Sequence, residues 1–302
     1  MDDDIICTEK IIADRNNGVS LGGNYNNSFG SINIAINGTL DIDCNGDKIV
    51  AVGGGVQSED TAITFNSGLV NIVGNSIKSL GIGAVSGEVT IFNNGADIKL
   101  DLNGNECVGI GTIDGNLEFT SNGNTEIYIR GEKIVGIGLF HYGNGNVKFL
   151  KGQPKIDSRG ADAVCIGSFD SDLDITCSAE YVCAYGEGTS VCGIGNRDGG
   201  GKIFITNGAV SSYILSANPN WFGNKGRNVV ITGGSIVKGA EEICDATNSF
   251  GDSLKPVTFE DTDSFAKHII TPRGDYVYRA EKTADASALC VFIPIECEIR
   301  DI

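Results

Sequence analysis

The feature that most constrains this chain is a short apolar strand that ends on glycine and recurs at nearly constant spacing. The clearest copies read Leu80-Gly-Ile-Gly83, Val108-Gly-Ile-Gly111 and Val135-Gly-Ile-Gly138. Successive anchors are separated by 28, 28, 27, 29, 28, 28 and 28 residues, the anchors being Gly55, Gly83, Gly111, Gly138, Gly167, Gly195, Gly223 and Gly251. A fixed period of this length is typical of a solenoid, whose units bury their apolar faces against one another.

Each period contains three short segments in which apolar and polar residues alternate between Asn-Gly breaks. Between Gly83 and Gly111 these segments are 88–92, 97–102 and 107–111. Such alternation indicates half-buried strands joined by tight turns, and no window carries helical periodicity with caps. The sequence therefore predicts an all-β fold, a right-handed parallel β-helix of about eight coils of about 28 residues with three strands each. The handedness follows from the general preference of parallel crossovers.

Equivalent inward residues of a parallel β-helix should stack about 4.8 Å apart along its axis. One expected row consists of Ile82, Ile110, Ile137, Ile166, Ile194, Phe222 and Phe250. A second row places Ile63/Phe65 beside Val89/Ile91, and Leu117/Phe119 beside Val147/Phe149. On an outward strand face, Lys99, Glu126 and Lys155 should align with alternating charge.

The repeats and their breaks divide the chain into a solenoid over residues 1–251 and a small β cap over 252–302. The last segment holds three of the five prolines and none of the Gly-Ile-Gly copies. We expect an antiparallel cap there, with a turn over 271–275. The first fifteen residues are expected to cap the other end, because solenoid ends otherwise expose open strand edges.

Charge and composition limit the possible partners. The net charge of −17 argues against nucleic acid and anionic membrane surfaces, which both require a basic face. No apolar run reaches eighteen residues, so we expect no membrane insertion. None of the ten cysteines occupies a slot equivalent to another in an adjacent coil, which predicts mostly reduced, packed thiols. The localisation would be extracellular or at the cell surface if a signal peptide was trimmed, and cytoplasmic otherwise.

Two outward surfaces are candidate binding sites. Apolar residues appear among threonines at outward positions of the first strand, namely Phe92, Leu150, Phe204 and Val230. They could line a contact surface or lie singly exposed. If the central isoleucine of each Gly-Ile-Gly points inward, the flanking glycines face outward and form a strip without side chains, including Gly109, Gly111, Gly136 and Gly138. The alternative is that these glycines serve turns with positive φ or close backbone approach.

The densest acidic cluster consists of Asp170, Asp172 and Asp174, whose alternation places three carboxylates on one side of a strand. It could hold Ca²⁺, or it could be a solvated loop of an acidic protein. His141 follows Gly138 in a turn, where a lone histidine is usually an ordinary surface residue. No nucleophile elbow, phosphate loop or two-metal pattern is present. No catalytic residue or further cofactor is therefore assigned, and the sequence leans away from an enzyme.

The Gly-Ile-Gly coils, the strand from Ile231 to Ile236 and the exit through Lys255-Pro-Val-Thr258 resemble Gly-Ile-Gly repeat proteins of gut anaerobic bacteria. The resemblance implies a β-helix displayed on the cell surface, of a kind often described as carbohydrate-binding or adhesin-like. We therefore expect a non-catalytic module that binds a glycan or a protein. A carbohydrate-active lyase or hydrolase with a groove on the middle coils is the alternative, and a self-associating structural element is a third.

Overall fold

The computed structural model describes the backbone of residues 32–56 and 58–222, together with eleven strands nearer the two ends of the chain. Side chains are described from Ile32 to Ser216 except Gln57, and also for Leu21, Asn220 and Phe222. Every regular element in this part of the chain is a β-strand. Within it, no helix is long and apolar enough to cross a membrane.

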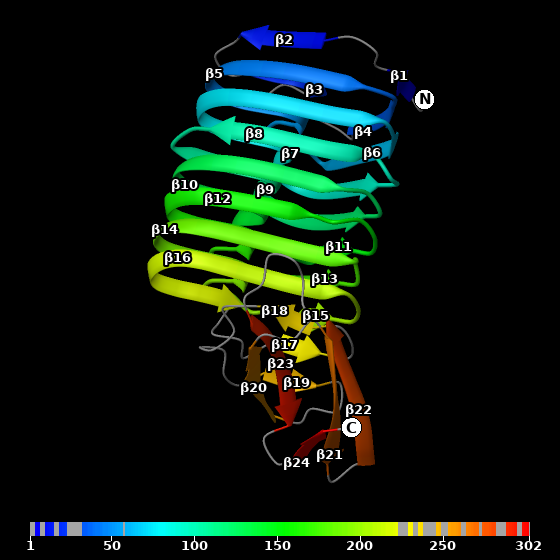
Figure 1. The fold of residues 1–302 in the computed structure, drawn as a ribbon. Helices are drawn as coiled ribbons and strands as arrows, with labels where there is room; N and C mark the ends of the chain where they lie inside the picture. The colour runs from blue at the N-terminus through cyan, green and yellow to red at the C-terminus, as the bar shows by residue number, and fades with distance from the viewer. Residues whose placement is uncertain are drawn as a thin grey trace.

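The strands form a parallel β-solenoid of about seven turns, which confirms the predicted fold class (Figure 1). Each coil contributes a long strand that bends through a corner, followed in most coils by a short one. The long strands are β5 (Leu40–Gly54), β7 (Leu69–Asn93), β9 (Glu106–Ser121), β10 (Thr125–His141), β12 (Lys155–Ser168), β14 (Tyr181–Asn196) and β16 (Ala209–Phe222). The short strands are β4 (Ile32–Asn37), β6 (Asp60–Ser67), β8 (Asp97–Asn103), β11 (Asn144–Phe149), β13 (Asp172–Cys177), β15 (Ile203–Ile205), β17 (Val229–Ile231), β18 (Ser235–Val237) and β19 (Ala246–Asn248).

The strands at the two ends pair differently. Three N-terminal strands pair in parallel with β4 and β5, so they continue the solenoid where a cap was expected; they are β1 (Asp4–Ile6), β2 (Lys10–Asp14) and β3 (Gly18–Gly22). The C-terminal strands pair antiparallel with one another, and they are β20 (Ser253–Glu260), β21 (Ser264–Thr271), β22 (Gly274–Glu281), β23 (Ala288–Pro294) and β24 (Glu298–Asp301). The boundary predicted at residues 251 and 252 lies outside the described residues.

The first predicted core row is confirmed over the described coils. Ile82, Ile110, Ile137, Ile166, Ile194 and Phe222 pair in register and are fully buried, while Phe250 lies outside the described residues. In the second row, the observed pairing is shifted by two residues from the predicted one at some coils: Ile63 pairs with Ile91, and Phe119 pairs with Val147. A shift of two keeps every side chain on its predicted face. Likewise, Gly83 pairs with Gly53 and not with Gly55, which was the predicted first anchor.

The Gly-Ile-Gly segment forms a re-entrant corner, and the expectation that its glycines face solvent is wrong. Gly109, Gly111, Gly136 and Gly138 are all buried. A Cβ added at Gly109 would lie 2.4 Å from the carbonyl oxygen of Gly136 and 3.2 Å from the core side chain of Ile127. Gly111 has φ +146°, and its Cβ would lie 1.8 Å from the oxygen of Gly138. The alternative reading, positive φ with close backbone approach, therefore accounts for the repeat.

The re-entrant corner creates a second apolar cluster on the outward side of the strands. Ile134 belongs to the inner core, whereas its neighbour Val135 belongs to this outer cluster, as expected from strand alternation. We call the following residues the outer cluster: Val50, Leu80, Val85, Val108, Val135, Phe140, Val164, Phe169 and Cys192. All of them are buried. Outward-facing residues at the corner are therefore buried in a small apolar core of their own.

The cysteine side chains are also divided between the inner core and the outer cluster. Cys165 lies in the inner core and Cys192 in the outer cluster, so the predicted placement on opposite faces is confirmed. Six cysteines have described side chains, and none of these six forms a disulfide bond: Cys44, Cys107, Cys165, Cys177, Cys183 and Cys192. Burial raises the pKa of Cys177 from 9.0 to about 12. Such buried, neutral thiols are poor nucleophiles.

Candidate functional site

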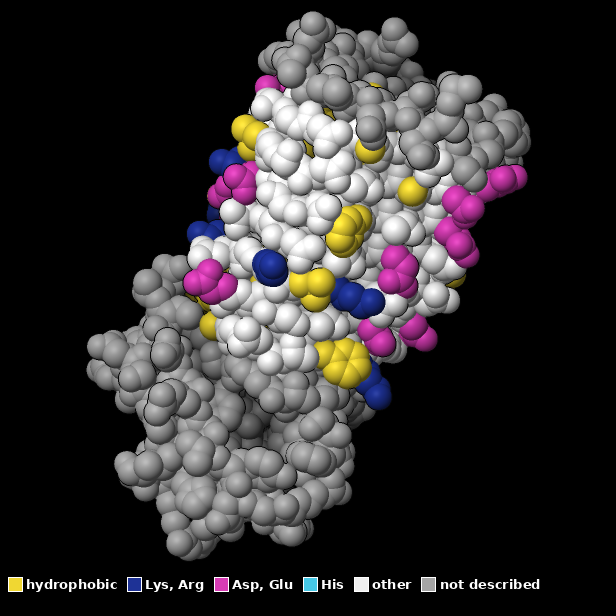
Figure 2. All heavy atoms as spheres, turned by 90° about the vertical axis from the view of Figure 1, so that its right-hand side faces the viewer, with side chains coloured by type: hydrophobic (Ala, Val, Ile, Leu, Met, Phe, Trp, Pro, Cys, Tyr) yellow, Lys and Arg dark blue, Asp and Glu magenta, His cyan; other side chains and the backbone are white. Residues whose placement is uncertain are grey.

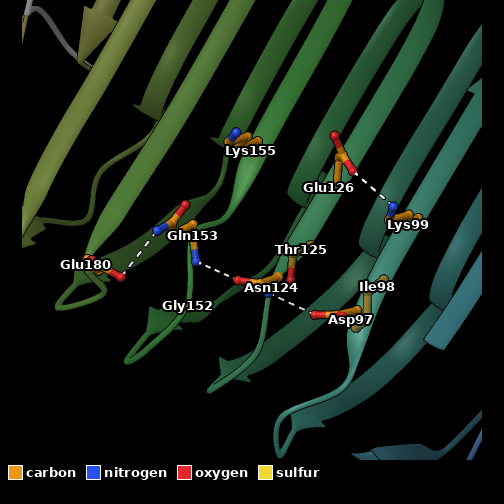
Figure 3. A pocket seen from close by; sticks show the side chains of 10 residues that line it. All are labelled: Asp97, Ile98, Lys99, Asn124, Thr125, Glu126, Gly152, Gln153, Lys155 and Glu180. Carbon is orange, nitrogen blue, oxygen red and sulfur yellow. Dashed lines mark hydrogen bonds and ion pairs between the residues drawn. The ribbon is translucent and has the colours of Figure 1, made fainter. Parts of the chain in front are cut away.

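A polar groove crosses neighbouring coils at the first residues of β8, β10 and β12 (Figure 3). It has a volume of about 470 Å³, within the range of about 300–1,000 Å³ that is typical of ligand sites. Ten residues line it, from β8, β10 and β12 and from the turns before β10, β12 and β14: Asp97, Ile98, Lys99, Asn124, Thr125, Glu126, Gly152, Gln153, Lys155 and Glu180. We call this site the polar groove.

Four of the lining side chains form a ladder of carboxylates and amides along the floor. Asn124 Nδ2 donates a hydrogen bond of 2.9 Å to Asp97 Oδ1. The backbone N–H of Gln153 donates to Asn124 Oδ1 at 3.0 Å, and Gln153 Nε2 donates to Glu180 Oε2 at 3.3 Å. Because each bond joins one coil to the next, the floor is fixed by the same parallel stacking that builds the core.

A row of alternating charge runs beside this ladder, as the sequence predicted. Glu126 pairs in register with Lys99 on one side and with Lys155 on the other. Lys99 Nζ lies 3.7 Å from Glu126 Oε2. The Tyr128 hydroxyl donates to Glu126 Oε1 at 2.7 Å, and this bond is the main reason why the pKa of Tyr128 is raised. Tyr128 thereby lies next to a lining residue of the groove, and it is 41% exposed.

The polar groove keeps hydrogen-bonding capacity that its own contacts do not use. Gln153 Oε1 accepts no hydrogen bond from any described residue, and the Lys155 ammonium has no partner among them. An amide oxygen offers two lone pairs and an ammonium offers three donors. The groove therefore presents donors and acceptors side by side, which suits a ligand whose groups can both donate and accept.

The predicted apolar candidates do not form one surface. Phe92 pairs with Thr120, Phe204 pairs with Thr176, and Lys148 lies between those threonines, so three coils separate the two rings. Leu150, which is 40% exposed, follows the end of β11, and Val230 pairs with Phe204, but its side chain lies outside the described residues. Figure 2, which views the right-hand side of Figure 1, shows hydrophobic side chains set apart by polar and charged ones.

The three carboxylates of the predicted metal cluster turn to different partners. Asp172 Oδ1 accepts a hydrogen bond from the backbone N–H of Gly200 at 2.6 Å, and Asp174 Oδ1 accepts one from Lys202 N at 2.7 Å. Asp170 instead contacts His141. Among the described residues, no group of three or more His, Cys, Asp or Glu is arranged to hold a metal ion. The Ca²⁺ site therefore stays a prediction without a geometric basis in this part of the chain.

A cluster of charged and aromatic side chains around His141 packs against two rings of the outer cluster, Phe140 and Phe169. Lys133 Nζ lies 3.4 Å from His141 Nε2, and His141 Nδ1 lies 3.2 Å from Asp170 Oδ2. These contacts fit an imidazole that accepts from the ammonium and donates to the carboxylate. Lys133 Nζ lies 4.9 Å from the centre of the buried Phe169 ring, over which Arg197 also lies.

The residue after His141 has an unusual backbone. Tyr142 is the one non-glycine residue of positive φ in the part of the chain that the structure describes, with φ 37°, and it is 78% exposed. Strained residues of this kind concentrate at functional sites and in tight turns. Sequence analysis singled out His141 and Asp170 separately and did not predict their contact, because the members of this cluster come from three different coils.

Sequence reasoning also missed the polar groove, since Asn124, Gln153 and Glu180 lie in turns and were not compared between coils. Aligning the coils on Lys99, Glu126 and Lys155 places Asp97, Asn124 and Gln153 in one column, with Glu180 one residue before its equivalent in the next coil. The chain is a parallel β-solenoid with a polar groove on its middle coils. Compared with protein-family models, curated proteins and solved structures, the chain shows no significant match.

Proposed function

We propose that this protein is a binding module that holds a glycan in the polar groove. The observation that carries the proposal is the groove floor, in which carboxylates and amides from four coils leave both donors and acceptors open toward solvent. Sugar hydroxyls donate and accept at once, so they can use both kinds of group. Tyr128 supplies an exposed ring at the border of the groove, where the apolar face of a sugar ring can pack.

A protein ligand is less well supported by the same surface. Protein interfaces depend on a desolvated centre of aromatic and aliphatic anchors, whereas the polar groove is lined by charged and amide side chains. The half-buried apolar residues Phe92 and Phe204 have three coils between them and cannot supply such a centre together.

Binding should be measured by calorimetry with hydroxyethyl cellulose, glucomannan and xylan as neutral probes and polygalacturonate as an anionic one. We expect at least one neutral polymer to bind, and the double variant Gln153→Ala/Lys155→Ala to weaken its binding by about tenfold or more, because two charge-assisted or amide hydrogen bonds are lost. The matched control is Lys148→Ala, which removes an outward lysine of a different strand face and should leave binding unchanged. Failure of all four polymers to bind would refute the proposal.

The His141 cluster favours a second candidate function, a carbohydrate-active enzyme on the middle coils. An imidazole oriented by a carboxylate is a common general base, and His141 has that relation to Asp170. The same polymers should be incubated with the protein and assayed for new reducing ends and for unsaturated products. Turnover that is abolished by His141→Ala, but retained in Lys148→Ala, would establish this function. Absence of turnover on polymers that do bind would leave the non-catalytic module.

A further inference from the structure

The polar groove has a direction, and this direction is set by the coil register. Its floor residues Asp97, Asn124, Gln153 and Glu180 belong to successive coils and are separated by 27, 29 and 27 residues. The row beside them, Lys99, Glu126 and Lys155, pairs in register strand by strand. Neighbouring strands lie about 4.8 Å apart. The groove therefore runs along the solenoid axis and offers a new set of polar groups at about that interval.

We infer that the ligand is a linear polysaccharide that lies along the solenoid axis and places about one sugar unit on each coil. This inference rests on the proposed glycan-binding function and specifies the class of glycan. A pyranose unit joined through equatorial oxygens advances its chain by close to one strand spacing. Each sugar unit then lies over one coil, with consecutive units presenting alternating faces. Three units meet the register-equivalent positions of Asp97, Asn124 and Gln153, and a fourth meets Glu180, one residue before the equivalent position of the next coil.

Extended peptides fit this interval poorly. A β-strand rises about 3.3 Å per residue, and its side chains return to the same side only after two residues, or about 6.6 Å. A polyproline II segment rises about 3.1 Å per residue and repeats after three. Neither repeat matches one coil. A compact or highly branched sugar could contact one coil, but it would leave the other equivalent positions empty.

The charges of the groove favour a neutral polymer. Three carboxylates, those of Asp97, Glu126 and Glu180, line it together with two ammonium groups, those of Lys99 and Lys155. The groove itself is therefore close to neutral, while the whole chain carries a net charge of −17. A polyanion would be repelled by this field and would find few cations to pair with. A neutral chain of sugars meets no such penalty.

The inference predicts how affinity depends on ligand length. Gluco-, manno- and xylo-oligosaccharides with β-(1→4) links and one to eight units should be titrated against the full chain, using the series whose polymer binds. We expect the dissociation constant to fall steadily from one to about four units and to change by less than about twofold beyond five, because the groove then ends.

A variant at one end of the groove tests the alignment. Glu180→Ala should make the gain in affinity stop about one unit earlier and leave disaccharide binding within about twofold of wild type. Lys148→Ala serves as the control and should leave the whole length series unchanged. Equal affinity for monosaccharide and tetrasaccharide, or a gain that continues to eight units, would overturn the alignment along the axis but not glycan binding. If no polymer binds, the proposed function itself fails.

Discussion

The polar groove and the glycine corner are built on the same coils, yet they use the repeat in opposite ways. At the corner, positive φ and the nearby carbonyl of the next coil leave no room for a side chain, so the sequence repeats almost without variation. At the groove, the side chains point to solvent, and register-equivalent positions hold Asp97, Asn124 and Gln153, while Glu180 lies one residue before the equivalent position of the next coil. Parallel stacking fixes the backbone in both places.

In a solenoid of this kind, a ligand site is expected at positions where the repeated sequence varies. Positions that repeat strictly are those that the backbone geometry requires, and positions that vary from coil to coil are free to carry a ligand site. We therefore expect substitutions at the corner to change stability, and substitutions at the groove to change binding. The following predictions test this division, beginning with the largest expected effect.

Gly111→Ala should destabilise the protein by about 4 kcal/mol or more. The new Cβ would lie 1.8 Å from the carbonyl oxygen of Gly138, at a residue with φ +146°. Gly95→Ala is the matched control, since Gly95 has φ +136° with no atom within 4 Å of the new Cβ. It should cost only the backbone strain, about 1–3 kcal/mol. Urea denaturation of both variants measures the difference, and equal losses would show that close stacking does not restrict the corner.

Phe169→Ala should cost about 3 kcal/mol, although Phe169 belongs to the outward side of the strands. Its ring is 1% exposed and lies 5.3 Å from the ring of Phe140, centre to centre, so its removal leaves a cavity. The control is Leu150→Ala, at a side chain that is 40% exposed, where we expect a loss below about 1 kcal/mol. If thermal or urea unfolding shows similar small losses for both, the outer cluster is not a packed core.

Stability should fall in alkaline solution because of the buried thiols. The pKa of Cys177 is raised from 9.0 to about 12 by burial, so above pH 9 the unfolded chain releases this proton while the folded chain retains it. The contribution is fully present below pH 9 and is lost as the pH rises toward 12, by about 1.4 kcal/mol per pH unit at most. Urea midpoints at pH 8 and pH 10.5 should differ less in Cys177→Ala than in the wild type. Identical pH dependence would mean that Cys177 ionises in the folded state.

The smallest effect is expected for the ion pair beside the groove. Lys99 and Glu126 are 56% and 35% exposed and 3.7 Å apart, so their double-mutant coupling in unfolding free energy should be below about 1 kcal/mol. The same substitutions should alter glycan affinity more than they alter stability. A coupling of several kcal/mol would show that groove side chains also determine stability, which contradicts the division between corner and groove.

The sequence predicted the fold well because one inward row, from Ile82 to Ile194, could be read directly from the spacing. The outward glycines were predicted wrongly because strict strand alternation was carried through the corner, where positive φ at Gly111 and its equivalents changes the direction of the chain. The polar groove was missed for another reason. Its column lies in turns whose lengths differ by one or two residues between coils, so only the register of the strands brings Asp97 and Gln153 to one floor.

The glycine corner has a consequence for how relatives of such a chain should be compared. Since the backbone of the adjacent coil excludes any Cβ at Gly83, Gly111 and Gly138, divergence would retain these residues whatever the ligand. The side chains of the groove floor, which point to solvent, would be free to change during divergence. Alignment scores between repeat proteins of this architecture would then be dominated by shared geometry, and agreement at the groove residues Asp97, Asn124, Gln153 and Glu180 would be the better guide to shared ligands.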